Sequence, residues 1–120
     1  MNILEDDLTR LNVEDILFII LIVAVVFNIC GDQCQKKYIN SHDKIFEKKA
    51  NNYYLIALII TIVIYFYFLY RNYNSYKKCN IEDKKLFEIK LIGSALLISG
   101  AFCLIYFQIN DSNYIGAPDI

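Results

Sequence analysis

Four residues near the end of the first apolar block carry side chains that bind metals or move protons: Cys30, Cys34, His42 and Asp43. Cys30 and Cys34 lie four residues apart, so a helix places both on one face. Zinc sites, however, use four tetrahedral ligands in spacings such as Cys-x2-Cys with a second pair. Cys-x3-Cys with one histidine does not complete that set. We therefore predict no metal site and interpret the cysteines as free thiols in helix contacts.

The rest of the chain offers no clearer site for chemistry. His42 is the only histidine, and no nucleophile or carboxylate group can be placed around it from the sequence. Cys79 and Cys103 make the cysteine count even, but the spacing is no disulfide framework, and their role is left open. We predict no catalytic, cofactor-binding or metal-binding residues and expect that the protein is not an enzyme.

Long apolar blocks dominate the sequence, in which 57% of the residues are hydrophobic. A helix rises about 1.5 Å per residue, so about 20 apolar residues cross a hydrocarbon layer of about 30 Å. Three segments meet this requirement, and the predicted spans are residues 13–31, 53–70 and 91–109. Buried helices of a soluble protein would each need a polar face, which these lack. The acidic segment before the first span is also not typical of a signal peptide.

Few polar groups interrupt the uncharged blocks of these spans, residues 16–29, 55–70 and 91–109. They are Asn28, Thr61, Ser94, Ser99 and Gln108. Pumps and proton-coupled carriers place Asp, Glu, Lys, Arg or His inside the membrane. Active transport by this chain alone is therefore not expected.

Polar segments connect the spans and extend their helices. We predict polar hairpins at residues 32–52 and 71–90 and a C-terminal coil at residues 110–120. Asn12, Ser41 and Asn80 are the expected helix caps, since Asn and Ser accept bonds from the first free N–H groups. The second helix is expected to begin at His42 and the third at Ile81. The predicted fold is all-α: one membrane domain of three transmembrane helices with short helical extensions.

Charge gives limited information about partners and orientation. The net charge of −1 provides no basis for nucleic-acid binding, so the lipid bilayer is the expected partner. Seven basic residues lie on the side of the N-terminus and second hairpin, against five on the other side. The positive-inside rule therefore weakly favours an inside N-terminus. Ile, Asn, Lys, Tyr and Phe make up half of the chain, which indicates an AT-rich genome and suggests a cell-membrane protein of such an organism.

Small residues are the best signal for helix packing. In membranes they let helix backbones approach closely. The candidate packing residues are Ala57, Thr61, Gly93, Ser99 and Gly100. The short second connection makes the second and third spans antiparallel neighbours, with Thr61 at the depth of Gly100. The contact could equally join two copies of the chain.

These observations predict a small multi-pass membrane protein that works through its helix surfaces. The favoured interpretation is a non-enzymatic accessory subunit or interaction protein, acting on a membrane protein partner or as a homo-oligomer. Two alternatives stay open. One is a self-assembling, holin-like or pore-forming protein, although the tail lacks the basic cluster that often ends holins. The other is an immunity protein that protects its producer from a membrane toxin.

Overall fold

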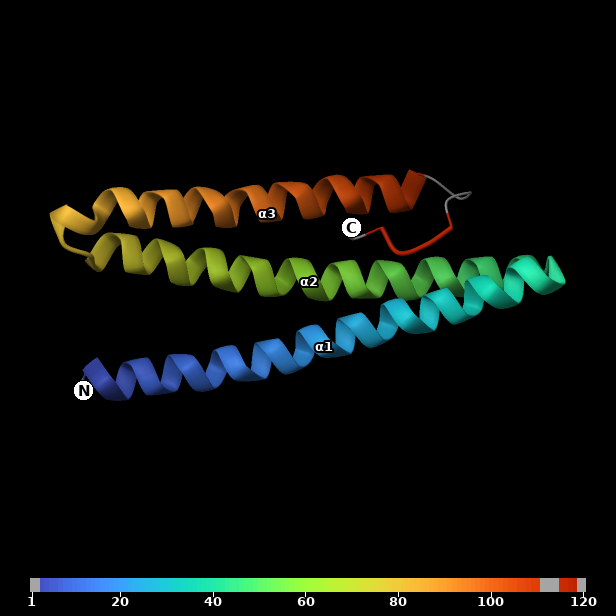
Figure 1. Ribbon diagram of the computed structural model, residues 1–120, viewed down its shortest axis with the longest axis horizontal. Helices are drawn as coiled ribbons and strands as arrows, with labels where there is room; N and C mark the ends of the chain where they lie inside the picture. The colour runs from blue at the N-terminus through green and yellow to red at the C-terminus, as the bar shows by residue number, and fades with distance from the viewer. Residues whose placement is uncertain (1–2, 111–114, 119–120) are drawn as a thin grey trace.

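Three long helices form an elongated bundle in the computed structural model, which describes residues 3–110 and 115–118, with side chains from Asp6 onward. These helices are α1 (Ile3–Ser41), α2 (Lys44–Lys78) and α3 (Lys84–Asn110). A short 3-10 helix, η1 (Ile81–Asp83), lies between α2 and α3. The middle helix, α2, contacts both α1 and α3, and these outer helices do not pack against each other. The N-terminus lies at the same end as the α2–α3 connection (Figure 1).

The predicted fold class is confirmed: the described chain is all-helical, and all three helices are long and apolar enough to cross a membrane. The longest dimension of the molecule is 59 Å, whereas a bilayer with its headgroups is about 40–45 Å thick. The helices therefore extend beyond the bilayer. Large apolar side chains cover the outside of the bundle, as expected where the surrounding solvent is lipid.

The helix ends differ from the predicted caps. Asn12 lies inside α1, which is helical from Ile3, so its prediction as a cap is wrong. Ser41 is the last residue of α1, and the side chain of Asp43 instead caps α2 by accepting the Ile45 N–H at 3.1 Å. Asn80 does precede η1, but its side chain makes no cap bond.

The first connection is much shorter than the polar segment at 32–52. Only His42 and Asp43 separate α1 from α2. His42 adopts a left-handed backbone conformation with φ of 58°, and its N–H donates to the Tyr38 carbonyl at 2.7 Å. This is the common way to end a helix with one left-handed residue. The segment is polar because it is a pair of helices in water, not because it is a loop.

Both outer helices contact α2 through a seven-residue repeat. The buried residues of the described part of α1 are Glu14, Ala24, Gly31 and Gln35, and with the half-buried Leu17, Leu21 and Asn28 they follow alternating steps of three and four. On α3 the same steps give Leu91, Ser94, Ile98, Ala101, Ile105 and Gln108. This spacing keeps one narrow face of each helix against its neighbour, as in coiled coils.

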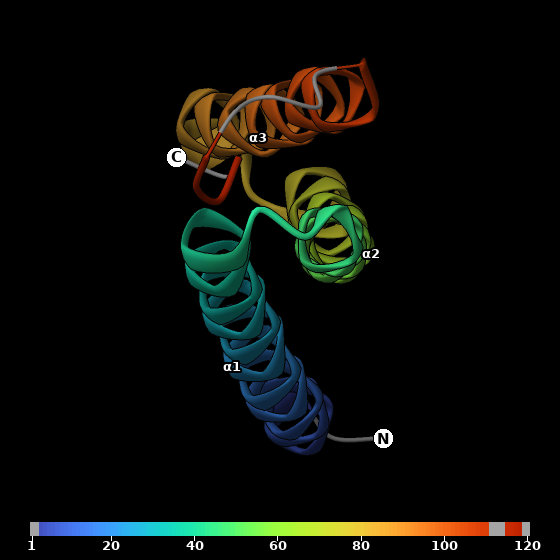
Figure 2. The same ribbon diagram turned by 90° about the vertical axis from the view of Figure 1, so that its right-hand side faces the viewer.

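The sizes of the α1 contact residues explain why α1 is inclined to α2. Leu17, Ala24 and Gly31 occupy equivalent positions and become smaller toward the first connection. Smaller side chains let the helices approach, and α1 and α2 lie closer together toward their connection and diverge toward the N-terminus (Figures 1 and 2). At the divergent end the Phe18 and Phe68 rings, with centroids 5.7 Å apart, bridge the two helices.

Candidate functional site

A chain of polar side chains links all three helices at the N-terminal end of the bundle. Glu14 of α1 accepts a bond from Arg71 Nη1 of α2 at 2.5 Å. The Nε and Nη2 groups of Arg71 donate to Asn72 Oδ1 at 3.2 and 3.0 Å. Asn72 Nδ2 in turn donates to the hydroxyl of Ser94 on α3. We call these four residues the N-side cluster.

Burial makes this cluster important for packing. The Glu14 side chain is only 8% exposed and that of Arg71 is 21% exposed, while Asn72 and Ser94 are buried. A buried charge or amide without a partner costs several kcal/mol, so each member depends on the others. The Arg71 guanidinium also lies 4.8 Å from the centre of the Phe68 ring, a favourable cation–π contact.

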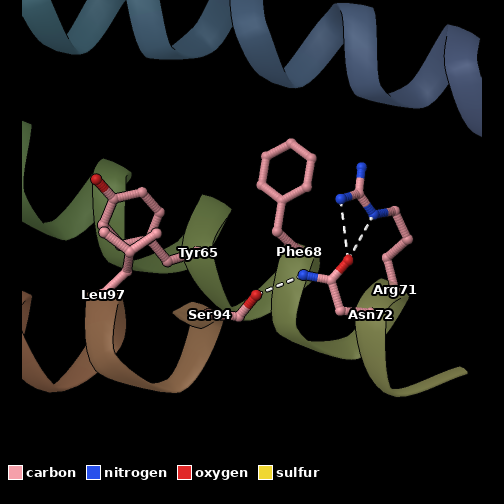
Figure 3. Close-up of a pocket in the computed structure, with 6 residues that line it drawn as sticks. All are labelled: Tyr65, Phe68, Arg71, Asn72, Ser94 and Leu97. Carbon is pink, nitrogen blue, oxygen red and sulfur yellow. Dashed lines mark hydrogen bonds between the residues drawn. The ribbon is translucent and has the colours of Figure 1, made fainter. Parts of the chain in front are cut away.

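A half-open pocket of about 200 Å³ adjoins this cluster. Its lining residues come from α2 and α3: Tyr65, Phe68, Arg71, Asn72, Ser94 and Leu97. Figure 3 shows Phe68 and Arg71 pointing toward α1, which passes over the pocket. The polar side chains lie at the end nearer the aqueous phase, and the apolar ones lie deeper along both helices. The pocket therefore has a polar end and an apolar end.

A second polar group, the C-side cluster, closes the opposite end of the bundle. It consists of Asp32, Gln35, Asn51, Tyr54 and Gln108. The Tyr54 hydroxyl donates to the Asp32 carboxylate and lies 3.1 Å from Gln35 Oε1. Gln108 of α3 donates to Asn51 of α2. Polar bonds thus connect α2 to each outer helix at this end as well.

The described part of the C-terminal tail joins the C-side cluster. Residues 115–118 lie between α1 and α3 (Figure 2). The Gly116 N–H donates to Gln35 Oε1 at 2.6 Å, and Pro118 is buried. Residues 111–114 and 119–120 of the predicted coil lie outside the described residues.

The N-side and C-side clusters lie at the two ends of the most apolar part of the bundle, which we call the apolar slab. Tyr54 and Arg71 lie about 26 Å apart along α2, at a rise of about 1.5 Å per residue. Glu14 and Asp32 lie about 27 Å apart along α1 by the same measure. Both separations approach the hydrocarbon thickness of about 30 Å. This is the spacing expected of polar groups near the two membrane–water boundaries.

Beyond the C-side cluster, α1 and α2 continue as a helical hairpin whose end we call the tip, residues 36–49. The tip carries five lysines: Lys36, Lys37, Lys44, Lys48 and Lys49. Lys37 and Lys49 lie 5.7 and 5.8 Å from the centre of the Phe46 ring. The nearby Glu47 carboxylate raises the pKa of Tyr38 above its usual value near 10. Ile39 and Ile45 are exposed, although both lie beyond the apolar slab.

The structure separates the predicted packing residues into two groups. Ala57 is buried in the bundle, and the Thr61 hydroxyl donates to the Ala57 carbonyl of its own helix at 2.8 Å. A Cβ built on Gly93 or Gly100 would meet no atom within 4 Å, and Ser99 is also exposed. The predicted contact of Gly100 with Thr61 is therefore wrong within one chain.

The cause of this error is rotation about the α3 axis. The antiparallel pairing of α2 with α3 is correct, since Asn72 bonds Ser94 and Asn51 bonds Gln108. Gly100, however, precedes the buried Ala101 by one residue, and one residue turns a helix by about 100°. Gly93 stands in the same relation to Ser94. The predicted position of Gly100 along the helix axis, level with Thr61, is consistent with this pairing. Gly93 and Gly100, however, face away from α2.

The cysteines and His42, considered above for metal or acid–base chemistry, do not form a common site. Cys30, Cys34 and Cys79 are half-buried free thiols, and Cys103 is an exposed one. Within the described ranges no group of three or more His, Cys, Asp or Glu residues could hold a metal ion. His42 instead ends α1 through its backbone.

The sequence does not predict the N-side cluster, because Glu14 lies in the first turn of the span at 13–31 and Arg71 lies just after the span at 53–70, and nothing in the sequence pairs these two ends. One signal could have revealed it: the seven-residue repeat places Glu14 in the same row as Leu21, Asn28 and Gln35. Comparison with known proteins adds no candidate function, because no family model, curated protein or solved structure matches the chain.

Proposed function

We propose that the protein is a non-enzymatic subunit of a larger membrane assembly and that the tip of the α1–α2 hairpin contacts its partner. The observation that carries the proposal is the exposure of Ile39 and Ile45 beyond the apolar slab. Ile39 lies about 10 Å past Asp32 along α1, outside the hydrocarbon layer. Apolar side chains in water are stabilised when a partner covers them.

The charge of the tip defines the chemistry of this partner. Its five lysines outnumber the two acidic residues, Asp43 and Glu47. A complementary surface would combine an apolar centre with acidic side chains at the rim, since charge complementarity orients partners and speeds their encounter. We place the protein in a cell membrane of an organism with an AT-rich genome, with the N-terminus inside, so that the tip faces outward.

Site-specific photocrosslinking tests this proposal. A photoreactive amino acid at Ile39 or Ile45 should crosslink to one and the same protein, and the adduct should disappear in a Lys48→Glu, Lys49→Glu variant. The same amino acid at Glu82, an exposed polar position at the opposite end, provides a control and should not yield that adduct. Crosslinks from Ile39 and Ile45 to lipid alone would contradict the proposal.

A second candidate is a self-assembling membrane protein that permeabilises the bilayer. The supporting observation is the open space beside Gly93 and Gly100, which would let α3 helices of two copies approach closely. Because a side chain at Gly100 meets nothing within its own chain, Gly100→Leu should block association without disturbing the fold. Dye leakage from vesicles containing the protein, lost in Gly100→Leu, would favour this candidate, whereas absence of leakage from the parent would exclude it.

A further inference from the structure

The pocket beside the N-side cluster has the polarity of an amphiphilic ligand. Its polar end is formed by Arg71, Asn72 and Ser94, and Phe68 and Leu97 line the deeper end. Arg71 lies near the boundary of the apolar slab, beside the headgroup layer that contains the lipid phosphates. With about 200 Å³, the pocket is smaller than the 300–1,000 Å³ of typical small-molecule sites. It therefore has room for a headgroup and the start of a chain, with the remainder of the ligand in the bilayer.

Arg71 retains hydrogen-bonding capacity at this site. A guanidinium has five N–H donors, and three of them are used toward Glu14 and Asn72. The remaining two are free of bonds to described residues, and the side chain is 21% exposed. Arginine binds phosphate oxygens through paired, charge-assisted bonds, so these two donors suit a phosphate group.

The charge around Arg71 also tolerates an anion. Glu14 is shared by two arginines, with Arg71 at 2.5 Å and Arg10 at 3.9 Å. One carboxylate cannot neutralise two guanidinium groups. Asp7 lies 3.7 Å from Arg10, but both side chains are more than two-fifths exposed, so water and salt screen that pair. The Glu14 carboxylate is thus paired with Arg71 and has Arg10 nearby, so a phosphate at the remaining donors of Arg71 would not face an unpaired negative charge.

We propose that this pocket binds one phospholipid, with the phosphate against the Arg71 guanidinium and an acyl chain along Phe68 and Leu97. The site is independent of the tip and of the partner proposed for it. The lipid would lie between α2 and α3, on the side of the pocket toward which Phe68 and Arg71 point (Figure 3).

Native mass spectrometry of the full-length protein in mild detergent tests the proposal with phosphatidylglycerol as the probe. The parent should retain one lipid, and Arg71→Gln should weaken binding by about tenfold or more, equivalent to about 1.4 kcal/mol. Lys77→Gln removes an exposed charge at the same end, which lies 4.3 Å from the Tyr73 ring centre, and should bind like the parent. Leu97 is 55% exposed, so Leu97→Trp can fill the apolar end without moving the helices and should also weaken binding.

Further measurements separate the lipid from other ligands. Diacylglycerol with the same acyl chains lacks the phosphate and should bind at least tenfold more weakly than phosphatidylglycerol. Inorganic phosphate at millimolar concentration should not displace the lipid. Equal binding of diacylglycerol, displacement by inorganic phosphate, or unchanged lipid binding in Leu97→Trp would each overturn the proposal. Leu97→Trp leaves the N-side cluster intact, so it decides the question even if Arg71→Gln does not fold.

Discussion

At the scale of single residues, Arg71 has the largest role in joining the helices. It bonds Glu14 on α1 and Asn72 on its own helix, and Asn72 continues the chain to Ser94 on α3. Removing one partner of a buried ion pair costs about 3–5 kcal/mol because the other charge is left uncompensated. Arg71 is partly exposed and Arg10 stays near Glu14, so a smaller cost is expected here.

A double-mutant cycle should measure this coupling. We expect Arg71→Gln and Glu14→Gln each to destabilise the fold by about 2 kcal/mol, and the double variant to lose at least about 1 kcal/mol less than the sum. Equilibrium unfolding in mixed micelles provides the free energies. Arg10→Gln, whose contact with Glu14 is long and exposed, is the control and should cost under about 0.5 kcal/mol. Additive single effects would show that the pair is not coupled.

Gly31 is the residue whose small size matters most. A Cβ there would lie 2.5 Å from Tyr54 Cε1, and Tyr54 is fully buried and bonded to Asp32. Gly31→Ala should therefore push α1 from α2 and destabilise the fold by about 1–3 kcal/mol.

Gly100→Ala is the matched control for this substitution, because a Cβ at Gly100 meets no atom of the chain. It should leave stability unchanged or raise it by up to about 1 kcal/mol, since Ala favours helix over Gly. Both variants can be compared by thermal unfolding in detergent. Equal effects at the two glycines would contradict the close approach at Gly31.

The sequence predicts which residues are polar within the spans but not what they contact. Ser94 and Gln108 stand out as polar interruptions, and both prove to bond α2. Ser99 stands out equally, yet it donates only to the Ala95 carbonyl of its own helix. Ser94 and Gln108 lie on the face of α3 that contacts α2, whereas Ser99 does not. The presence of a polar residue in a span does not indicate which face it occupies.

At the scale of elements, the heptad spacing determines how the helices pack. In α3 the buried residues Ser94, Ile98 and Ala101 differ widely in polarity, so a search for small or apolar residues alone does not find the contact face. Gly93 and Gly100 form a stripe with the correct spacing of seven, but it is turned away from α2. A spacing of seven residues indicates that two residues lie on the same face of a helix. It does not indicate whether that face packs against a neighbouring helix.

The helix ends provide a direct test of the observed boundaries. Asp43 caps α2, so Asp43→Ala should reduce stability by about 1 kcal/mol. Asn12 is an exposed residue within α1, so Asn12→Ala should be neutral or stabilising by a few tenths of a kcal/mol. Thermal unfolding followed by circular dichroism can compare the two. A loss at Asn12 as large as that at Asp43 would indicate that α1 begins at Asn12 after all.

At the scale of the whole molecule, the apolar blocks made the three spans predictable because the bilayer demands length and apolar composition from every crossing helix. The extent of the helices was less predictable. Residues 32–41 are polar and were assigned to a hairpin, but they continue α1 as far as Ser41. In water a helix of mixed polarity is stabilised by its neighbour, here α2, and such pairing is a tertiary property.

The distribution of basic residues over the two ends of the molecule predicts its orientation in the membrane. The N-terminus and the α2–α3 connection share one end (Figure 1), so seven basic residues lie at that end and five at the other. The positive-inside rule then predicts, from this small difference, an inside N-terminus and an outside tip. In a background without the native cysteines, a membrane-impermeant maleimide should label Asn40→Cys in intact cells and spare Asn80→Cys. Both should be labelled after permeabilisation. Labelling of Asn80→Cys in intact cells would show that the excess of basic residues at the N-terminal end does not set the topology.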